Sequence, residues 1–316
     1  MINSLQYITL TNFKLNSGRI LDINLSYQIF GQELHTAPII LVNHALTGNS
    51  NVSGEKGWWK NLIGNGKIID ASRFTVICFN IPGNRFDGFS IENHEDYNTK
   101  DIAKMFLAGL SVLNIEYLYV IIGGSLGGSV GWEMLAVSPD LAGIFIPIAC
   151  DYKTSDWIHA QCMIQNFLLN QQDKPLQKAR IHAMLCYRTP ESLNERFKNI
   201  FDSEKATRKS LDWLNFHAES LNERFSLSAY RLMNHLLMNI NADGERIKDI
   251  SADIHFIAVN SDLFFPASEM KNCFEGLIKT KKNTFYQEIQ SIHGHDAFLM
   301  EYEQLNRILG PIINKK

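Results

Sequence analysis

The segment at 117–129 constrains the fold of this chain more than any other. A run of strand-forming residues at 117–122 leads directly into Gly123-Gly124-Ser125-Leu126-Gly127, and a helical pattern follows at once. Glycines permit a sharp turn between the two elements because they have no Cβ to clash with the neighbouring backbone. An ordinary glycine-rich turn is the alternative, but it does not explain the strand before it and the helix after it. We therefore expect Ser125 on a sharp strand-to-helix turn.

Short apolar runs alternate with helical patterns along the rest of the chain. Near-continuous apolar runs, typical of parallel strands buried on both faces, lie at 38–42, 74–81, 117–122 and 144–150. Two more strands are predicted at 254–259 and 284–289, and an alternating pattern predicts an antiparallel edge strand at 20–30. Helices are predicted at 99–113, 127–138, 267–279 and about 297–309. The alternation predicts an α/β fold with a mostly parallel, doubly wound sheet flanked by helices.

A long helical segment interrupts this alternation. About a hundred residues separate the strands predicted near 145 and 255, and they are rich in helix formers and bulky apolar side chains. Their apolar content is too high for a solvated linker. We therefore predict a helical lid at 152–250, inserted into a core made of 1–151 and 251–316.

Composition and charge exclude several classes of protein. The chain has 316 residues, of which 45% are hydrophobic and 20% charged, so an ordered core can form. The net charge of −3 and the scattered basic residues argue against a nucleic-acid-binding protein. No apolar stretch is long enough to span a membrane, and the first residues lack the pattern of a signal peptide. Five cysteines without a Cys-x-x-Cys pair indicate reduced thiols and a cytoplasmic location.

Three candidate catalytic side chains follow in the order Ser125, Asp262, His295. This is the chain order of α/β-hydrolase folds, in which a Gly-x-Ser-x-Gly turn carries the nucleophile. Asp262 follows a predicted strand, and His295 lies between the last strand and the last helix. We expect His295 to take the Ser125 proton and return it to the leaving group, while Asp262 fixes the imidazole tautomer. A turn or cap role for Asp262 is the alternative, and the matching order and positions argue against it.

Acyl transfer also needs donors for the oxyanion of a tetrahedral intermediate. One donor is expected to be the backbone N–H of Leu126, directly after the nucleophile. The second is expected to be the N–H of Leu46, in the loop that follows the strand at 38–42. An ordinary strand-end turn would explain Gly48 but not the whole arrangement.

A metal site is a weaker alternative at the C-terminal histidines. His293, His295 and Asp296 carry side chains that bind Zn²⁺. No other cluster of histidine, cysteine or aspartate has ligand spacing, and the segment lies where a triad histidine is expected. We therefore expect no metal.

Several motifs together resemble those of the homoserine O-acetyltransferase family. The matching segments are 43–50, 57–59, 62–70, 122–128, 179–188, 223–230, 261–266 and 294–299. The resemblance spans about 15–310 of the chain. As a set these motifs are specific, although each alone is not.

The resemblance implies a two-step acyl transfer through an acyl-serine at Ser125. The family transfers an acyl group from acyl-CoA to the hydroxyl of an amino acid, so the resemblance implies acetyl-CoA as co-substrate, L-homoserine as acceptor and a step in methionine biosynthesis. It also implies that Arg180, Tyr187 and Asp296 lie near the acceptor. Their chemistry fits, because the amino-acid acceptor is a zwitterion, whose carboxylate pairs with a cation and whose ammonium pairs with an anion. The alternatives are a solvated Arg180 and an Asp296 that caps the last helix.

The resemblance further implies a homodimer, with the lid helices at or near the interface, and no tightly bound cofactor. The segment at 81–90 departs from the family pattern, and the chain is shorter than typical members. That segment borders the active-site entrance in the family, so succinyl in place of acetyl, and serine or another alcohol in place of homoserine, stay open. Two other classes also stay open. One is a serine esterase or hydrolase with the same triad, and the other is a non-catalytic binding protein, against which the complete triad argues.

Overall fold

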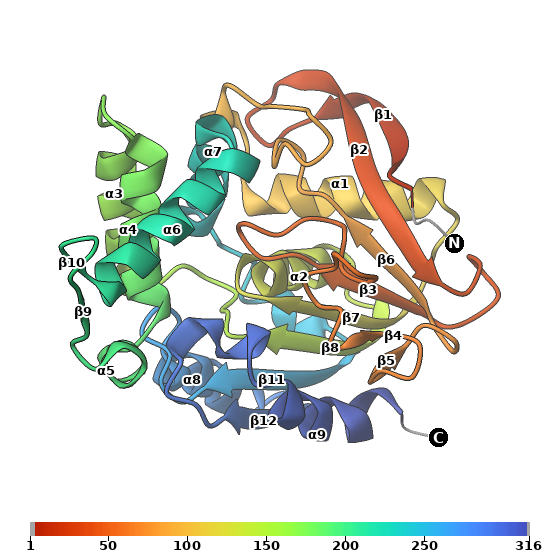
Figure 1. The fold of residues 1–316 in the computed structure, drawn as a ribbon. Coiled ribbons are helices and arrows are strands. Elements are labelled where there is room, and N and C mark those ends of the chain that lie inside the picture. Colours follow the sequence, from red (N-terminus) through yellow and green to blue (C-terminus); the bar gives the residue numbers. More distant parts are fainter. Residues whose placement is uncertain (1–3, 315–316) are drawn as a thin grey trace.

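A central eight-stranded sheet organises the computed structural model, which describes residues 4–314 (Figure 1). In spatial order its strands are β1 (Gln6–Lys14), β2 (Ile20–Gly31), β6 (Thr75–Phe79), β3 (Ile39–Asn43), β7 (Leu118–Gly124), β8 (Ala142–Ile148), β11 (Asp253–Val259) and β12 (Thr284–Ile289). The pairs β1–β2 and β2–β6 are antiparallel, and every pair from β6 to β12 is parallel. The expected mostly parallel α/β sheet is therefore confirmed.

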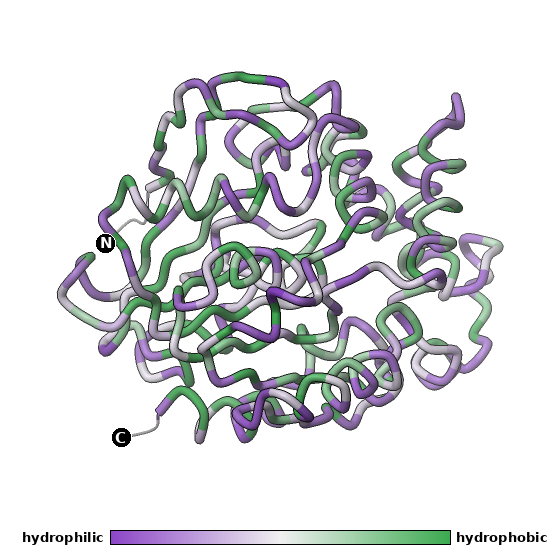
Figure 2. The backbone as a smooth tube through the Cα atoms, turned by 180° about the vertical axis from the view of Figure 1, so that it is seen from behind, coloured by the Kyte–Doolittle hydropathy of each residue, from purple (hydrophilic) through white to green (hydrophobic). Residues whose placement is uncertain are grey.

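Helices cover both faces of the sheet. The packing of one face includes α1 (Thr99–Val112), α2 (Leu126–Val137) and α8 (Ala267–Leu277), and the packing of the other includes α9 (Tyr302–Ile313). All five side chains of β3, and all five of β6, are buried. This burial explains their unbroken apolar sequence, since a parallel strand is covered on both faces. Figure 2 shows hydrophobic stretches along the strands in the middle of the molecule and hydrophilic ones around its periphery.

The predicted position of the sheet edge at 20–30 is wrong. β2 pairs with β6 on one side and with β1 on the other, so β1 forms the edge. β1 gives a weak sequence signal because only Ile8 and Leu10 of its nine residues are buried. The last helix also begins later than expected, at Tyr302, because residues Gly294–Leu299 form a 3-10 turn.

The segment between β8 and β11 forms a group of helices at one side of the molecule (Figure 1). They are α3 (Asp156–Leu169), α4 (Pro175–Tyr187), α5 (Pro190–Phe197), α6 (Lys209–Arg224) and α7 (Leu227–Met238). Ser155, Thr189 and Ser226 start α3, α5 and α7 by accepting hydrogen bonds from backbone N–H groups of the first turn. α4 and α5 each begin with a proline, whose missing N–H costs nothing there.

Short elements complete the chain. They are β4 (Ile63–Gly64), β5 (Ile69–Asp70), β9 (Phe201–Asp202), β10 (Thr207–Arg208) and the 3-10 turns η1 (His94–Asp96), η2 (Arg246–Asp249) and η3 (Gly294–Leu299). Within residues 4–314, no helix is both long and apolar enough to cross a membrane.

Candidate active site

Ser125 lies on a strained turn between β7 and α2. Its backbone has φ 55° and ψ −133°, a conformation that residues other than glycine rarely adopt. Its N–H donates to the carbonyl of Ile148 at 2.9 Å, which anchors the turn to β8. A Cβ on Gly127 would lie 2.2 Å from the carbonyl oxygen of Asn43, so glycine lets α2 approach the loop after β3. The sequence context therefore folds into the sharp turn that was expected, and strain of this kind is typical of functional sites.

Ser125, His295 and Asp262 form a chain of hydrogen bonds. His295 Nε2 lies 2.9 Å from Ser125 Oγ, and His295 Nδ1 lies 2.7 Å from Asp262 Oδ2. The other carboxylate oxygen, Oδ1, accepts from the N–H groups of Phe264 at 2.7 Å and Phe265 at 2.9 Å. A carboxylate held in this way accepts the Nδ1 proton, so Nε2 is free to accept the serine proton. The three residues are each 4% exposed.

Aromatic rings surround the imidazole of His295. The ring centroids of Tyr187, Phe264, Phe265 and Phe298 lie 5.4, 5.2, 5.6 and 5.6 Å from it. Such a shell excludes water and strengthens the electrostatic interactions inside it. Sequence reasoning missed the part that Phe264 and Phe265 play in holding Asp262. Their positions, two and three residues after an aspartate, are the signal that could have revealed it.

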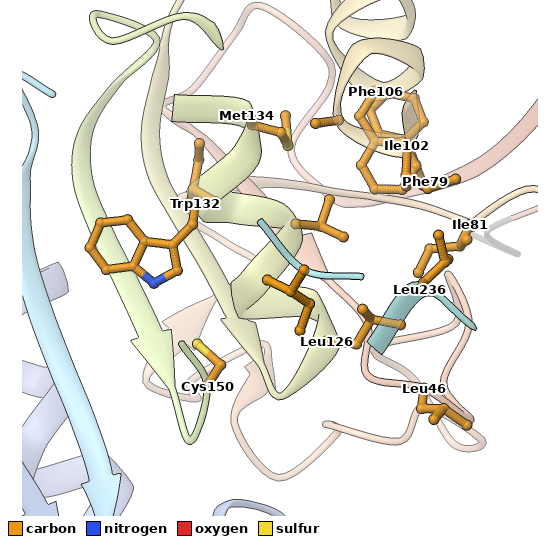
Figure 3. Close-up of a cluster of buried hydrophobic side chains, with 14 of the residues drawn as sticks. Leu46, Phe79, Ile81, Ile102, Phe106, Leu126, Trp132, Met134, Cys150 and Leu236 are labelled. Carbon is orange, nitrogen blue, oxygen red and sulfur yellow. The ribbon is translucent and has the colours of Figure 1, made fainter. Parts of the chain in front are cut away.

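The two expected oxyanion donors lie on segments that touch. Leu126 is the first residue of α2, so its N–H has no carbonyl one turn earlier in the helix. Leu46 is 5% exposed and lies on the loop after β3, against which Gly127 packs. Figure 3 shows the side chains of Leu46 and Leu126 in one buried cluster, together with Leu236 from α7. The backbone N–H groups of Leu46 and Leu126 remain the predicted donors.

Arg180 and Tyr187 share a face of α4. The Arg180 guanidinium carbon lies 5.9 Å from the centre of the Tyr187 ring. Burial raises the pKa of Tyr187 well above its ordinary value, so the hydroxyl keeps its proton. The Arg180 Nε is buried and has no hydrogen-bond partner within residues 4–314. The Arg180 side chain is therefore partly buried on this face of α4.

Asp296 pairs with Arg188, an interaction that the sequence did not reveal. The Arg188 Nε donates to Asp296 Oδ2 at 2.9 Å, and both side chains are less than one-fifth exposed. The Arg188 guanidinium also lies over the Trp213 ring, 5.8 Å from its centre. Asp296 does not cap the last helix, because α9 has Glu301 at its N-cap. Arg188 directly follows Tyr187, and nothing in its sequence position identifies its partner.

The described histidines do not form a metal site. The Nδ1 atom of His293 lies 2.8 Å from the hydroxyl oxygen of Ser192, while His295 belongs to the serine–histidine–aspartate chain. Between residues 4 and 314, no group of three or more histidine, cysteine, aspartate or glutamate side chains is placed to hold a metal ion.

Comparison with known proteins shows the family to which the chain belongs. Residues 38–299 match the model of the alpha/beta hydrolase fold. Homoserine O-acetyltransferase of Methanococcus vannielii is 28% identical over 348 residues, which cover 96% of this chain and 71% of that protein. The enzyme of the same name from Deinococcus radiodurans is 28% identical over 309 residues, which cover 95% of this chain and 89% of that protein.

Solved structures agree on the fold. Homoserine O-acetyltransferase from Bacillus anthracis superposes with a TM-score of 0.88 at 16% identity, covering 100% of this chain and 99% of that one. An acetylester hydrolase from Corynebacterium glutamicum superposes with a TM-score of 0.81 at 16% identity, covering 99% of this chain and 96% of that one. The chain belongs to the alpha/beta hydrolase fold family, and proteins named homoserine O-acetyltransferase are related to it in sequence along most of its length.

Proposed function

We propose that this protein is an acyl-CoA-dependent O-acyltransferase that moves an acetyl group from acetyl-CoA to the hydroxyl of L-homoserine, a step in methionine biosynthesis. The observation that carries the proposal is the hydrogen-bonded chain of Ser125, His295 and Asp262, next to a lid helix that bears Arg180 and Tyr187. The name shared by the sequence relatives supports the choice of the acetyl group and of homoserine as its acceptor.

In the first half-reaction Ser125 becomes acetylated. The His295 Nε2 takes the proton of Ser125 as Oγ bonds to the carbonyl carbon of acetyl-CoA. The N–H groups of Leu46 and Leu126 donate to the oxyanion that forms. When the intermediate collapses, the carbon–sulfur bond breaks and His295 gives its proton to the coenzyme A sulfur. The products are acetyl-Ser125 and free coenzyme A.

In the second half-reaction the acceptor displaces the serine. The homoserine hydroxyl gives its proton to His295 Nε2 as its oxygen attacks the acetyl-serine carbonyl. Collapse of the second intermediate releases O-acetyl-homoserine, and the proton returns to Ser125 Oγ. Asp262 stabilises the imidazolium in both halves.

The lid and the turn that carries His295 supply the binding groups for the acceptor. Arg180 binds the homoserine carboxylate, and its buried Nε, which lacks a partner within residues 4–314, supports this role. The Tyr187 hydroxyl donates to the same carboxylate. Asp296 is held through Oδ2 by Arg188 and offers Oδ1 to the ammonium. The aromatic shell around His295 disfavours water, so the oriented acceptor competes with hydrolysis.

A homodimer through α3 is part of the proposal. Trp157, Ile164 and Phe167 are 46%, 43% and 62% exposed, and their spacing places them on the outward face of that helix. Exposed apolar side chains that share one helix face are a feature of interaction surfaces.

A cytoplasmic location is proposed as well. All five cysteines are free thiols, which supports a reducing compartment.

The test is release of coenzyme A thiol from acetyl-CoA by the purified protein, with and without L-homoserine. Continuous release that needs both homoserine and Ser125 supports the transferase, and Ser125→Ala is the matched control. Continued release beyond one equivalent per enzyme without acceptor points instead to a hydrolase, since acylation of Ser125 alone releases only one. No release from acetyl-CoA or succinyl-CoA, together with turnover of simple esters, contradicts the proposal.

A further inference from the structure

His44 is a buried histidine with both ring nitrogens committed to the backbone. It follows β3, is 1% exposed, and places Nδ1 2.8 Å from the carbonyl oxygen of Ala45. Its Nε2 lies 3.0 Å from the backbone nitrogen of Ile81. Because a backbone N–H can only donate, Nε2 is the acceptor and the proton resides on Nδ1. The His44 imidazole therefore donates to the Ala45 carbonyl.

The peptide between Ala45 and Leu46 is the one that carries a predicted oxyanion donor. The Ala45 carbonyl also accepts from the N–H of Gly48 at 2.9 Å, so two donors fix its direction. In a planar trans peptide the C=O and N–H point in opposite directions. The groups that hold the Ala45 carbonyl therefore also set the direction of the Leu46 N–H.

We propose that His44 is a positioning residue that holds the Ala45–Leu46 peptide with the Leu46 N–H directed at the oxyanion. The inference rests on the acyl-serine chemistry of the proposed function, but it does not depend on acetyl-CoA or homoserine. His44 is not a proton carrier, because neither ring nitrogen is free to exchange a proton with Ser125. That exchange belongs to His295, whose Nε2 lies 2.9 Å from Ser125 Oγ.

The segment at 81–90, which departs from the family pattern, braces His44. The Asn84 amide nitrogen lies 3.4 Å from His44 Nε2 and donates to Asn80 Oδ1 at 3.1 Å. Asn80 Oδ1 also accepts from the N–H of Ser50 at 2.8 Å. Ser50 lies farther along the loop after β3 that carries Leu46, which we call the oxyanion loop (residues 44–50). Buried polar networks of this kind, when satisfied, hold one conformation rigidly.

Burial also keeps the imidazole neutral. Desolvation lowers the pKa of His44 to about 4, although the hydrogen bond to Ala45 opposes this. The donor at Nδ1 and the acceptor at Nε2 therefore persist at neutral pH, as the bracing role requires.

Two substitutions of His44 separate the two ring nitrogens. In His44→Asn the amide NH₂ falls near the position of Nδ1 and can still donate to Ala45. In His44→Gln the amide reaches the position of Nε2, where its oxygen can accept from Ile81, but Ala45 loses its side-chain donor. His35→Asn and His35→Gln are matched controls, since His35 is exposed in the loop before β3, at the opposite end of the strand.

The readout is the rate at which diethyl 4-nitrophenyl phosphate reacts with Ser125. Ser125 Oγ bonds to phosphorus, 4-nitrophenolate leaves, and His295 takes the serine proton, so neither acetyl-CoA nor homoserine is needed. We expect His44→Asn to stay within about fivefold of wild type and His44→Gln to lose about 10²-fold, the order of loss when one oxyanion donor is removed. For ester turnover the loss should fall on kcat and leave KM unchanged.

Equal losses in both variants, or a loss confined to KM, would overturn the proposal. If a His44 variant does not fold, Asn84→Ala loosens the brace at Nε2 and should lower kcat a fewfold at constant KM; an unchanged kcat there contradicts the bracing role. Dependence on His44 without any turnover of acetyl-CoA would remove the proposed function and leave this inference intact. A wild-type Ser125 that does not react with the phosphate triester removes both.

Discussion

Arg188 and Asp296 join the C-terminal end of α4 to the residue that follows the triad histidine, with Arg188 Nε 2.9 Å from Asp296 Oδ2. The pair ties α4 to the 3-10 turn that carries His295. Two roles follow for Arg188. Under the proposed function it would orient Asp296 toward the acceptor, and it pairs with a carboxylate next in sequence to the imidazole of His295.

Arg188→Gln should weaken acceptor binding while it leaves acylation intact. We expect KM for L-homoserine to rise about tenfold, because a hydrogen bond to a charged group contributes roughly 1.5–3 kcal/mol. KM for acetyl-CoA should stay unchanged. Steady-state kinetics with each substrate varied in turn measure both constants. Arg188→Lys keeps the charge but loses the planar fork, so its KM for L-homoserine should lie between those of the wild type and of Arg188→Gln. Equal rises in both KM values would show that Arg188 supports the lid as a whole instead.

Asp262→Asn should lower kcat about 10⁴-fold, the order found when the triad aspartate loses its charge in this way. The backbone N–H groups of Phe264 and Phe265 can only donate, so the asparagine oxygen must face them. The amide NH₂ then faces His295 Nδ1 and forces the proton onto Nε2, which can no longer accept from Ser125. Turnover of a chromogenic acetate ester measures the effect. Asp173→Asn, an exposed carboxylate before α4, is the control, and a loss below tenfold for Asp262→Asn would contradict the assignment.

The stability of the protein should fall between pH 8 and pH 5 partly because of His44. Its folded-state pKa of about 4 lies below the ordinary value of 6.5, so the unfolded chain binds more protons in this window. Unfolding is therefore favoured as the pH falls, by about 2 kcal/mol at pH 5. His44→Asn removes this dependence. Urea unfolding of both proteins at pH 8 and pH 5 measures it as a difference between the variants. Identical pH dependence would show that His44 is not buried as a neutral base.

Phe167→Asp should convert a dimer into a monomer. The substitution places a charge on the outward face of α3, in its last turn, where Trp157 and Ile164 are also exposed on the same helix. Size-exclusion chromatography with light scattering measures the mass. Val112→Asp is a matched control, because Val112 is 57% exposed at the end of α1, outside the proposed interface. A wild-type protein that is already monomeric, or a Phe167→Asp variant that stays dimeric, would rule out this interface.

Most of the fold could be predicted from local sequence patterns. The sequence predicted β3, β6 and β7 from their unbroken apolar runs, and the turn at Ser125 from the glycines around it. Each of these signals lies within a few neighbouring residues. β1 was missed because its two buried side chains give almost no periodicity. The start of α9 was misplaced because η3 (Gly294–Leu299) precedes it and carries the same apolar residues.

Contacts between segments far apart in the chain could not be predicted from the sequence, apart from the triad. The chain order Ser125, Asp262, His295 could be predicted because the fold fixes it. The Arg188–Asp296 pair spans 108 residues, and the His44–Ile81 hydrogen bond spans 37. No spacing rule links such positions, so the bracing of the oxyanion loop emerges only from the folded structure.

The decisive measurement is the mass of the protein after mixing with acetyl-CoA alone, followed by addition of L-homoserine. We expect one acetyl group on the peptide that contains Ser125 and its disappearance, with formation of O-acetyl-homoserine, when the acceptor is added. The acetyl group should be absent from Ser125→Ala. Product formed by Ser125→Ala at the wild-type rate, or acetylation at a residue other than Ser125, would contradict an acyl-serine mechanism.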